Sequence, residues 1–457
     1  MQPDDVQGPS EPKVYEEEME IINSFGETIP IGKSNWVGLR VEEDIYRTGI
    51  TGELYLLDAE NIAQQFDFNG QEKIKLKFGT PSKPPIVFEG RIYAAPKRRN
   101  VSDSSAGYAI PFISAECLRS QQIKVRQGFV NEPYSDMVTK IYERYMKPSG
   151  NKPLYVEPTL QLASFSFPGW TPIKTIRKLA TKSVSADVSY RGATYLFFER
   201  LGNGKNIPGQ SGFLFVSLEA LLDPDRGPYT NPAELYRYEW KSIEDHDPRD
   251  FTSIIDLVET KKPNTLDNIT KGMYSSTLIV HDIVKGTVHK HKLNYAQEFD
   301  HTVGGSTPLP YSKELVDASD SYEIYTTKKY QNYGGVHGGP DSSAGFPEGT
   351  ILQRHSNFQQ MNNLIATYTV PGDSLRRVGD IVQLELPSPE TVGSDGPKRD
   401  SVMSGRHFVT RVVHNIDRTS PSARYETTIQ SVKRDSVGDR AVATHSLDPP
   451  LEFNGIF

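Results

Sequence analysis

Cysteine is nearly absent from this 457-residue sequence, which contains only Cys117. A single cysteine cannot form a disulfide within one chain, so we expect a fold that does not depend on an oxidising compartment. Cys117 comes soon after the apolar run 108–113, and free cysteines in such settings are mostly buried and unreactive. We therefore predict that it is not a catalytic nucleophile.

Long apolar runs are also missing. The longest apolar region, 212–222, is shorter than the ~18 residues of a membrane helix, and it contains Glu219. The first residues are acidic and polar, without the basic-then-apolar order of a secretory signal. We therefore expect a soluble protein that is made in a cytoplasm and does not insert into a membrane.

The sequence has no excess of positive charge, because 51 Lys and Arg residues face 58 Asp and Glu residues, for a net charge of -7. A protein that coats nucleic acid needs such an excess to neutralise phosphates. The composition therefore excludes a general nucleic-acid coat. An acidic wall repels a polyanion, so the composition still fits DNA that passes the protein transiently without being gripped.

Motifs for catalysis and phosphate binding fail on their spacing. In 26–34, five residues separate the glycines where a phosphate-binding loop requires four, and we expect a strand rather than a helix to follow. The segment 209–212 lacks the second glycine of a nucleophile elbow and is expected to be a hairpin loop. No acidic pair lies in an apolar setting that suits glycoside hydrolysis. We predict no catalytic residue and no cofactor.

Two histidines form a pattern that is compatible with metal binding. His289 and His291 share one face of a predicted strand, and His281 and His301 lie nearby in the sequence. A zinc site needs a third or fourth ligand, which the sequence does not place. We therefore predict no metal site and leave open whether His289 and His291 bind anything.

One pattern is present near both ends of the chain. Residues 73–78 alternate between charged and apolar, and a turn rich in Pro and Gly leads to a second apolar strand at 86–93. Residues 380–386 alternate in the same way, and a loop of similar composition leads to a strand at 406–414. Such alternation is typical of a half-exposed antiparallel sheet. The sequence therefore predicts two β-domains of similar build.

The expected fold class is α+β and β-rich, with two similar antiparallel β-barrel-like domains near the two ends and α+β domains inserted between them. The predicted boundaries are an N-terminal arm at 1–33, a first β-barrel-like domain at 34–118, an α+β domain at 119–235, a second β-barrel-like domain at 236–275 and 351–435, inserted strands with a long loop at 276–350, and a C-terminal tail at 436–457.

Shorter elements are expected within these domains. Helices are predicted at 59–65, after Pro133, from Thr171, within 266–274 and from Asn357. Strands that form hairpins are predicted at 194–198 with 212–216 and at 276–282 with 287–293.

Five groups of short motifs follow one another between residues 34 and 435. They are Trp36 to Asp58 with its strand Thr51-Gly-Glu-Leu-Tyr-Leu-Leu-Asp58, the turn and strand at 68–81, Trp170-Thr-Pro172 with 195–199 and 212–218, 272–276 with 280–282, and 370–373 with 378–380. Taken in this order, the motifs resemble the baseplate hub protein of contractile-tailed bacteriophages.

The resemblance implies a homotrimeric ring in which each chain supplies two similar β-domains, giving pseudo-six-fold symmetry. Strands at the edges of the sheets can pair across subunits, and rotational symmetry lets a head-to-tail contact close. The implied partners are the central spike, the tail tube or tube-initiator protein, the tape measure protein and the baseplate wedge proteins. The implied location is the virion, after assembly in the host cytoplasm, and no enzymatic activity is implied.

Two other functions stay open. A β-rich chain with 23 tyrosines also suits a receptor-binding or carbohydrate-degrading tail protein. The same hub architecture is also expected in a secretion-type contractile injection system. The arm, the insertion at 300–350 and the tail have no counterpart in the resemblance.

Overall fold

The computed structural model describes the chain in segments. They are residues 15–32, 35–58, 68–80, 83–94, 97–102, 105–160, 162–187, 192–202, 211–222, 234–237, 251–261, 264–282, 286–294, 322–328, 347–362, 364–388, 400, 402–419 and 424–433. Their strands form one sheet of 14 strands and smaller sheets of two or three strands, accompanied by short helices. The predicted β-rich α+β fold class is therefore confirmed.

The N-terminal part of the large sheet is an antiparallel unit, called the first unit. Its strands are β3 (Trp36–Asp44), β4 (Thr51–Asp58), β5 (Lys73–Gly79), β6 (Ile86–Ile92), β7 (Lys97–Ser102) and β8 (Ser105–Ser114). Neighbouring strands lie in the order β3-β4-β8-β6-β5, and β7 continues β6 along β8. Ile74, Leu76 and Phe78 of β5 are buried and alternate with lysines, which confirms the predicted alternation.

Two further strands extend the first unit, and they correct the expected arm at 1–33. β1 (Tyr15–Ile22) pairs antiparallel with β5, and β2 (Thr28–Pro30) pairs antiparallel with β1. Ile21 and Ile29 are buried in the core of the first unit. The described part of this segment is a component of the sheet, because pairing satisfies its backbone and the core buries its apolar side chains.

The C-terminal part of the large sheet, called the second unit, repeats this arrangement. Its strands are β14 (Glu234–Arg237), β15 (Asp256–Lys261), β19 (Leu364–Pro371), β20 (Ile381–Glu385), β21 (Gly405–Asp417) and β22 (Arg424–Lys433). The order β15-β19-β22-β21-β20 matches the order β3-β4-β8-β6-β5. When β7 is counted with β6 and β14 is left aside, both units place their first, second, fifth, fourth and third strands side by side. Both first strands bulge at the same place, at Val37 and at Val258.

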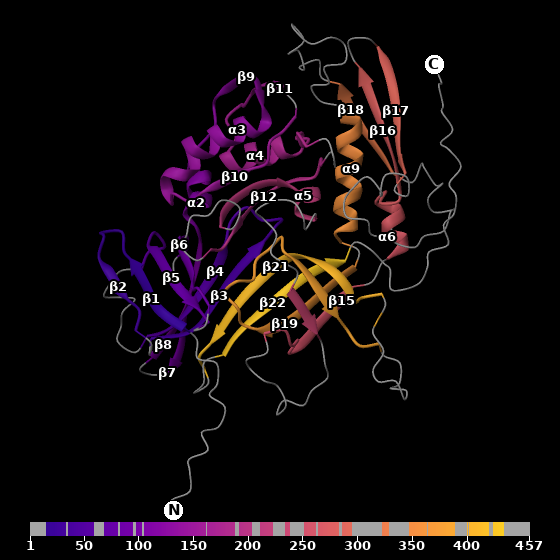
Figure 1. The fold of residues 1–457 in the computed structure, drawn as a ribbon. Coiled ribbons are helices and arrows are strands. Elements are labelled where there is room, and N and C mark those ends of the chain that lie inside the picture. Colours follow the sequence, from indigo (N-terminus) through magenta and orange to yellow (C-terminus); the bar gives the residue numbers. More distant parts are fainter. Residues whose placement is uncertain are drawn as a thin grey trace, which may run out of the picture.

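The two units are joined edge to edge, because β3 pairs antiparallel with β21 (Figure 1). Among the named strands, the path of paired strands runs from β15 to β2. β14, which pairs with β20, also forms backbone hydrogen bonds through Arg237 with residues 252–254, directly before β15, so the second unit connects back to its own first strand. In a single chain, the two similar domains are joined in one continuous sheet.

An α+β region connects the two units. It contains helices α2 (Ala115–Gln122), α3 (Tyr134–Ile141), α4 (Pro172–Ala180) and α5 (Leu218–Leu222), helical turns η1 (Tyr142–Met146) and η2 (Lys147–Ser149), and strands β9 (Gly128–Pro133), β10 (Leu154–Val156), β11 (Leu162–Ser166), β12 (Tyr195–Arg200) and β13 (Gly212–Ser217). The helices predicted after Pro133 and from Thr171 are confirmed, and the Thr171 hydroxyl caps α4. β12 and β13 form the predicted hairpin.

A third region lies between β15 and β19 in the sequence. It contains α6 (Thr265–Thr270), β16 (Ser275–Asp282), β17 (Thr287–Asn294), β18 (Glu323–Lys328) and α9 (Pro347–Gln360). The predicted helix in 266–274 and the β16-β17 hairpin are confirmed. α9 begins at Pro347 rather than at Asn357, because Pro suits a first turn and Leu352 packs with Leu278 of β16. The predicted helix at 59–65, most of 300–350 and the tail lie outside the described residues.

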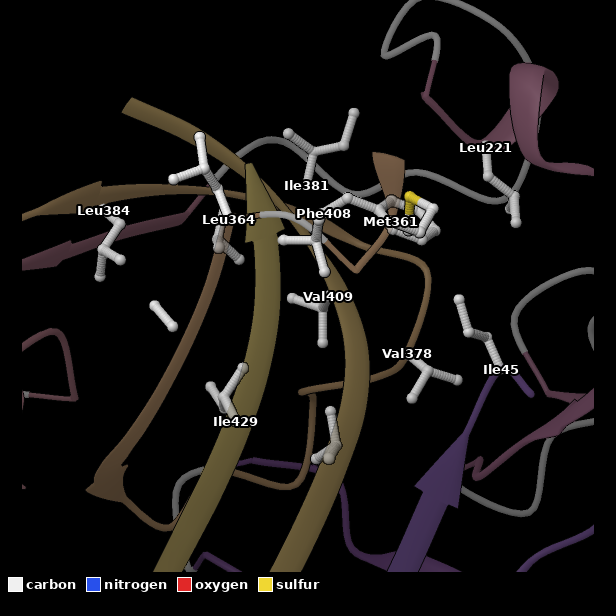
Figure 2. Packing of buried hydrophobic residues seen from close by; sticks show 14 of the residues in the cluster. Ile45, Leu221, Met361, Leu364, Val378, Ile381, Leu384, Phe408, Val409 and Ile429 are labelled. Atoms are coloured by element: carbon white, nitrogen blue, oxygen red, sulfur yellow. The ribbon is translucent and has the colours of Figure 1, made fainter. Parts of the chain in front are cut away.

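Each unit has its own apolar core, and each core also contains residues from the other unit. The core of the first unit includes Ile416 of β21 and Tyr425 of β22. The core of the second unit includes Ile45, which follows β3 of the first unit. Ile45 lies in the same cluster as Val378, from the loop before β20, and Leu221 of α5 (Figure 2). Full burial of one large apolar side chain contributes roughly 1.5–3 kcal/mol. The shared side chains therefore stabilise the two units as one body.

Candidate functional site

The junction between the two units is the candidate functional site, because it joins two copies of one strand arrangement. Residues 411–417 of β21 pair with residues 38–44 of β3 in an antiparallel ladder. The ladder continues where the Ile45 amide donates a hydrogen bond to the Thr410 carbonyl at 3.1 Å. The junction is thus a continuous stretch of antiparallel sheet.

A cluster of charges lies across the junction. The Glu42 carboxylate on β3 accepts a hydrogen bond from Arg411 of β21 at 2.8 Å, and Arg47 and Arg40 lie 3.1 and 3.4 Å from it. Burial alone would raise the pKa of Glu42, but the hydrogen bond from Arg411 and the three positive charges outweigh burial and hold this pKa below its usual value. Glu42 is therefore ionised and anchored to both units.

The neighbouring residue, Glu43, is fully buried. Its two carboxylate oxygens accept hydrogen bonds from the backbone amides of Leu201, at 2.7 Å, and Val378, at 3.0 Å. Burial raises the pKa of Glu43 to about 7, against the opposing effects of these amides and of Arg200 and Arg377. Glu43 therefore ties β3 to the end of β12 and to the loop before β20.

Arg200, at the end of β12, is among the largest fully buried side chains. Its Nε donates a hydrogen bond to the Val378 carbonyl at 2.7 Å, and its Nη2 lies 3.8 Å from Asp380. Gly379 between them has a φ of +81°, and a Cβ at this position would overlap with Arg200. Glycine is therefore required here for both the backbone conformation and the close approach of the guanidinium.

A second buried charge cluster attaches the α+β region to the first unit. Nζ of Lys152 lies 2.5 Å from Glu199 and 3.5 Å from Glu116. Glu199 also accepts hydrogen bonds from the Ile50 amide, at 3.1 Å, and from the Ser114 hydroxyl. Burial lowers the pKa of Lys152, but Glu199 and Glu116 outweigh burial and raise it above its usual value. Lys152 is therefore charged and holds the two carboxylates together.

An aromatic contact forms a further link between the units. His414 of β21 and Tyr425 of β22 lie with their ring centroids 6.1 and 6.3 Å from that of Phe78 in β5. Nδ1 of His414 is 2.8 Å from the Tyr425 hydroxyl. Burial and the guanidinium of Arg376 lower the pKa of His414 to about 3, so the imidazole is neutral at pH 7.

The structure places the two candidate histidines on one strand. His289 and His291 lie on β17, opposite Val280 and Leu278 of β16. His289 is exposed and His291 is half-buried. Among the described residues, no group of three or more His, Cys, Asp or Glu side chains could hold a metal ion. His301 lies outside the described residues.

The other sequence motifs lie in ordinary structural settings. Cys117 is buried, and burial raises the pKa of its thiol above the usual value. A strand, β3, follows the segment 26–34. Gly212 begins β13 of the hairpin, and residues 209–210 of the predicted loop lie outside the described residues. In the part of the chain that the structure describes, no helix is long and apolar enough to cross a membrane.

The buried charges of the junction were not predicted from the sequence. The available signal is the acidic run from Glu42 to Asp44 at the end of an alternating strand. Successive side chains of a strand point to opposite faces, so one of two neighbouring carboxylates must turn toward the core. The identity of its partner, Arg200, depends on the tertiary structure.

No model of a known protein family matches this chain, and neither does any curated protein sequence. Solved structures do resemble it. The 43 kDa tail protein of prophage MuSo2 from Shewanella oneidensis matches with a TM-score of 0.52 and 10% identity, over 92% of this chain and 99% of that chain. The tail protein from Neisseria meningitidis MC58 matches with a TM-score of 0.52 and 9% identity, over 92% of this chain and 97% of that chain.

Both likenesses cover nearly the whole length of both proteins, so they include the two units and the regions attached to them. At such low sequence identity they establish the fold. The sequence motifs independently resemble a tail protein of contractile phages, and the structure agrees with them at this level. This chain therefore has the fold of these tail proteins.

Proposed function

We propose that the protein is the structural hub of a contractile phage-tail baseplate. Three copies form a ring with pseudo-six-fold symmetry, which joins the six-fold tail tube to the three-fold central spike. The ring surrounds the channel through which the tape measure protein and then DNA leave. It assembles in the host cytoplasm and becomes part of the virion. Its work is geometric and requires no catalysis.

The internal repeat is the observation that carries this proposal. Two units with the same strand order are joined edge to edge by β3 and β21. Three such chains supply six similar units around one axis, and rotational symmetry allows a head-to-tail contact to close into a ring. The fold shared with tail proteins supports the same role.

The proposed partners follow from the position of the ring. The tail tube or tube-initiator protein sits on one side and the spike on the other, while baseplate wedge proteins surround the ring. DNA passes transiently, and the net charge of -7 fits a channel protein that does not grip it.

The oligomer's mass and symmetry test the proposal. Light scattering after gel filtration should give three times the chain mass of 51.2 kDa, and electron microscopy should give a three-fold ring with an open channel. A protein that stays monomeric at high concentration and binds neither a tube nor a spike protein contradicts the proposal. A compact particle that cleaves polysaccharide favours the carbohydrate-degrading alternative instead.

A further inference from the structure

Residues 115–187 of the α+β region, called the helical lobe, differ in charge from the rest of the chain. The lobe contains 11 Lys and Arg residues against six Asp and Glu residues, whereas the whole chain contains 51 against 58, so the residues outside the lobe contain 40 against 52. Two of the acids, Glu116 and Glu157, are buried, and Lys152 is bound to Glu116. The surface of the lobe is therefore basic on an otherwise acidic protein.

Four cations lie close together on this surface and are called the basic face: Arg119, Arg126, Arg144 and Lys174. The Val125 amide donates a hydrogen bond to the Trp170 carbonyl at 2.7 Å, which sets Arg126 beside the start of α4. A Cβ at Gly169 would lie 3.5 Å from Nε of Arg126, so this side chain runs across the turn before α4. Nζ of Lys174, on α4, lies 5.3 Å from the ring centroid of Trp170.

The other two cations adjoin these through Tyr145. Cζ of Arg144 lies 5.3 Å from the ring centroid of Tyr145. Nη1 of Arg144 and the Tyr145 hydroxyl lie 3.5 and 3.4 Å from Oε1 of Gln127, the residue that follows Arg126. Nε of Arg119 donates a hydrogen bond to the Tyr145 carbonyl at 3.0 Å. A continuous chain of contacts therefore connects the four cations.

The cations of the basic face are positioned without being neutralised. Acids on the same lobe already have lysine partners, since Glu132 lies 2.7 Å from Lys140 and Glu143 lies 2.8 Å from Lys147. In the part of the chain that the structure describes, no carboxylate lies within 4.0 Å of a charged nitrogen of the basic face. Ring and backbone contacts hold these side chains before any ligand arrives, which lowers the rotamer entropy that binding removes.

The surroundings of the basic face favour protein carboxylates over a nucleic acid. Trp170 and Tyr145 pack against the core of the lobe, and cations lie over both rings, so the surface that a base would stack on is occupied. A long polyanion would also have to pass over the acidic remainder of the chain, whereas an acidic patch on a folded protein meets only the basic face. Three of the four cations are arginines, whose planar guanidinium matches the two oxygens of a carboxylate.

We infer that the basic face binds an acidic surface of a partner protein, by charge-assisted hydrogen bonds to Asp and Glu side chains. Figure 1 places α2, α3 and α4 on the same side of the large sheet as the third region. In the proposed ring each of these regions occurs three times, so this side suits the three-fold spike better than the six-fold tube. The choice of the spike rests on the proposed hub function, whereas the preference for an acidic polypeptide does not.

Binding of the full-length protein to fluorescent poly-L-glutamate tests the inference. The wild type should bind this probe, and its affinity should fall as salt is added. The variant with both Arg126→Glu and Lys174→Glu should bind roughly tenfold more weakly, because two attractions at exposed positions become repulsions. Oligodeoxythymidine of equal charge and phosphatidylserine vesicles are the competing probes. Tighter binding of either one than of poly-L-glutamate would overturn the inference in favour of a nucleic acid or a membrane surface.

A second double variant provides the matched control. Lys290→Glu with Lys292→Glu changes the net charge by the same amount, at exposed positions on β17 of the third region. Its affinity for poly-L-glutamate should stay within about twofold of wild type, because salt screens charges that lie far from the bound probe. Equal losses in the two double variants would mean that overall charge governs binding, and would contradict a specific basic face.

Lysine acetylation of the wild-type protein gives a second measurement that needs no variant. Bound poly-L-glutamate should slow the reaction of Lys174 and of Lys178, one turn further along α4, and should leave that of Lys290 unchanged. Unchanged reactivity of Lys174 would overturn the inference, even if the glutamate variants failed to fold.

The result also separates the basic face from the hub function. A trimeric ring that does not bind poly-L-glutamate would contradict the basic face and leave the hub function standing. A monomer that binds poly-L-glutamate through Arg126 and Lys174 would support the basic face and contradict the hub function, and with it the choice of the spike.

Discussion

Glu42 of β3 and Arg411 of β21 meet at 2.8 Å across the junction, although they belong to different units. Their side chains are 8% and 35% exposed, so solvent screens this pair less than a fully exposed one. A hydrogen bond to a charged group contributes about 1.5–3 kcal/mol. The contact is therefore a measurable part of what holds the two units together.

The variant Glu42→Gln should lower the free energy of unfolding at pH 7 by about 1–3 kcal/mol, because it leaves the arginines around Glu42 without their carboxylate. The pKa of Glu42 lies below its usual value in the folded state, so its contribution is present above the unfolded pKa and is lost as the pH falls through the folded pKa. Urea unfolding at fixed protein concentration measures both effects.

Glu89→Gln on β6 is the control for Glu42, because Glu89 is exposed. This variant should change the free energy of unfolding by less than about 0.5 kcal/mol. Equal losses in the two variants would contradict a specific role of Glu42 at the junction.

Glu43 should produce a different pH dependence. Its pKa is about 7 in the folded protein and 4.5 in the reference state, so the folded state binds an extra proton between these values. Stability should therefore fall as the pH rises from about 4.5 to about 7, by on the order of 3 kcal/mol. Glu43→Gln removes this titration, so its stability deficit relative to wild type should be larger at pH 5 than at pH 8. Urea unfolding at both pH values measures the deficit, and a constant deficit would contradict the assignment.

Gly372→Ala should destabilise the protein by about 1–3 kcal/mol, because the added methyl group overlaps with the buried ring of Tyr425. Gly128→Ala is the matched control, since a Cβ at Gly128 meets no atom within 4 Å. Thermal unfolding of the two variants should differ clearly. Similar midpoints would mean that the Tyr425 ring moves aside at little cost.

Acid should weaken the aromatic contact between the units. The pKa of His414 is about 3 in the folded protein and 6.5 in the reference state, so its stabilising effect is complete above 6.5 and is lost as the pH falls toward 3. At pH 5 the wild type should have lost about 2 kcal/mol from this residue. His414→Phe should be less stable than wild type at pH 8, and this deficit should shrink at pH 5.

Ile416→Val is the control for His414, because Ile416 is buried on the same strand and carries no titratable group. Its deficit relative to wild type should be the same at pH 5 and pH 8. If His414→Phe behaves in the same way, the buried histidine does not control acid sensitivity.

Local patterns predicted the strands whose two faces differ. β5 could be found because Ile74, Leu76 and Phe78 alternate with lysines and only one face meets the core. β1 was not predicted as a strand, because acidic residues dominate its sequence and obscure the apolar residues Met19 and Ile21. The pairing of β1 is indicated by charge complementarity with its partner strand, since Glu18 and Glu20 stand opposite Lys77 and Lys75 of β5.

The junction itself could not be predicted, because alternation specifies which face of a strand is buried and not which edge it pairs with. β3 and β21 read as similar alternating strands, and nothing local in either identifies the other as its neighbour. The same is true of Glu43 and Arg200, whose proximity arises only after three separate segments have packed.

The repeat is uneven in one connection. Residues 45–50 join the first two strands of the first unit, whereas 262–363 join those of the second and include the third region with β16 and α9. In the proposed ring of six nearly identical units, a three-fold partner could otherwise dock in two rotational settings of almost equal energy. The third region would occur at every second unit of that ring, so the two settings would differ in what the partner contacts. In the proposed complex, the long connection would therefore select a single rotational setting.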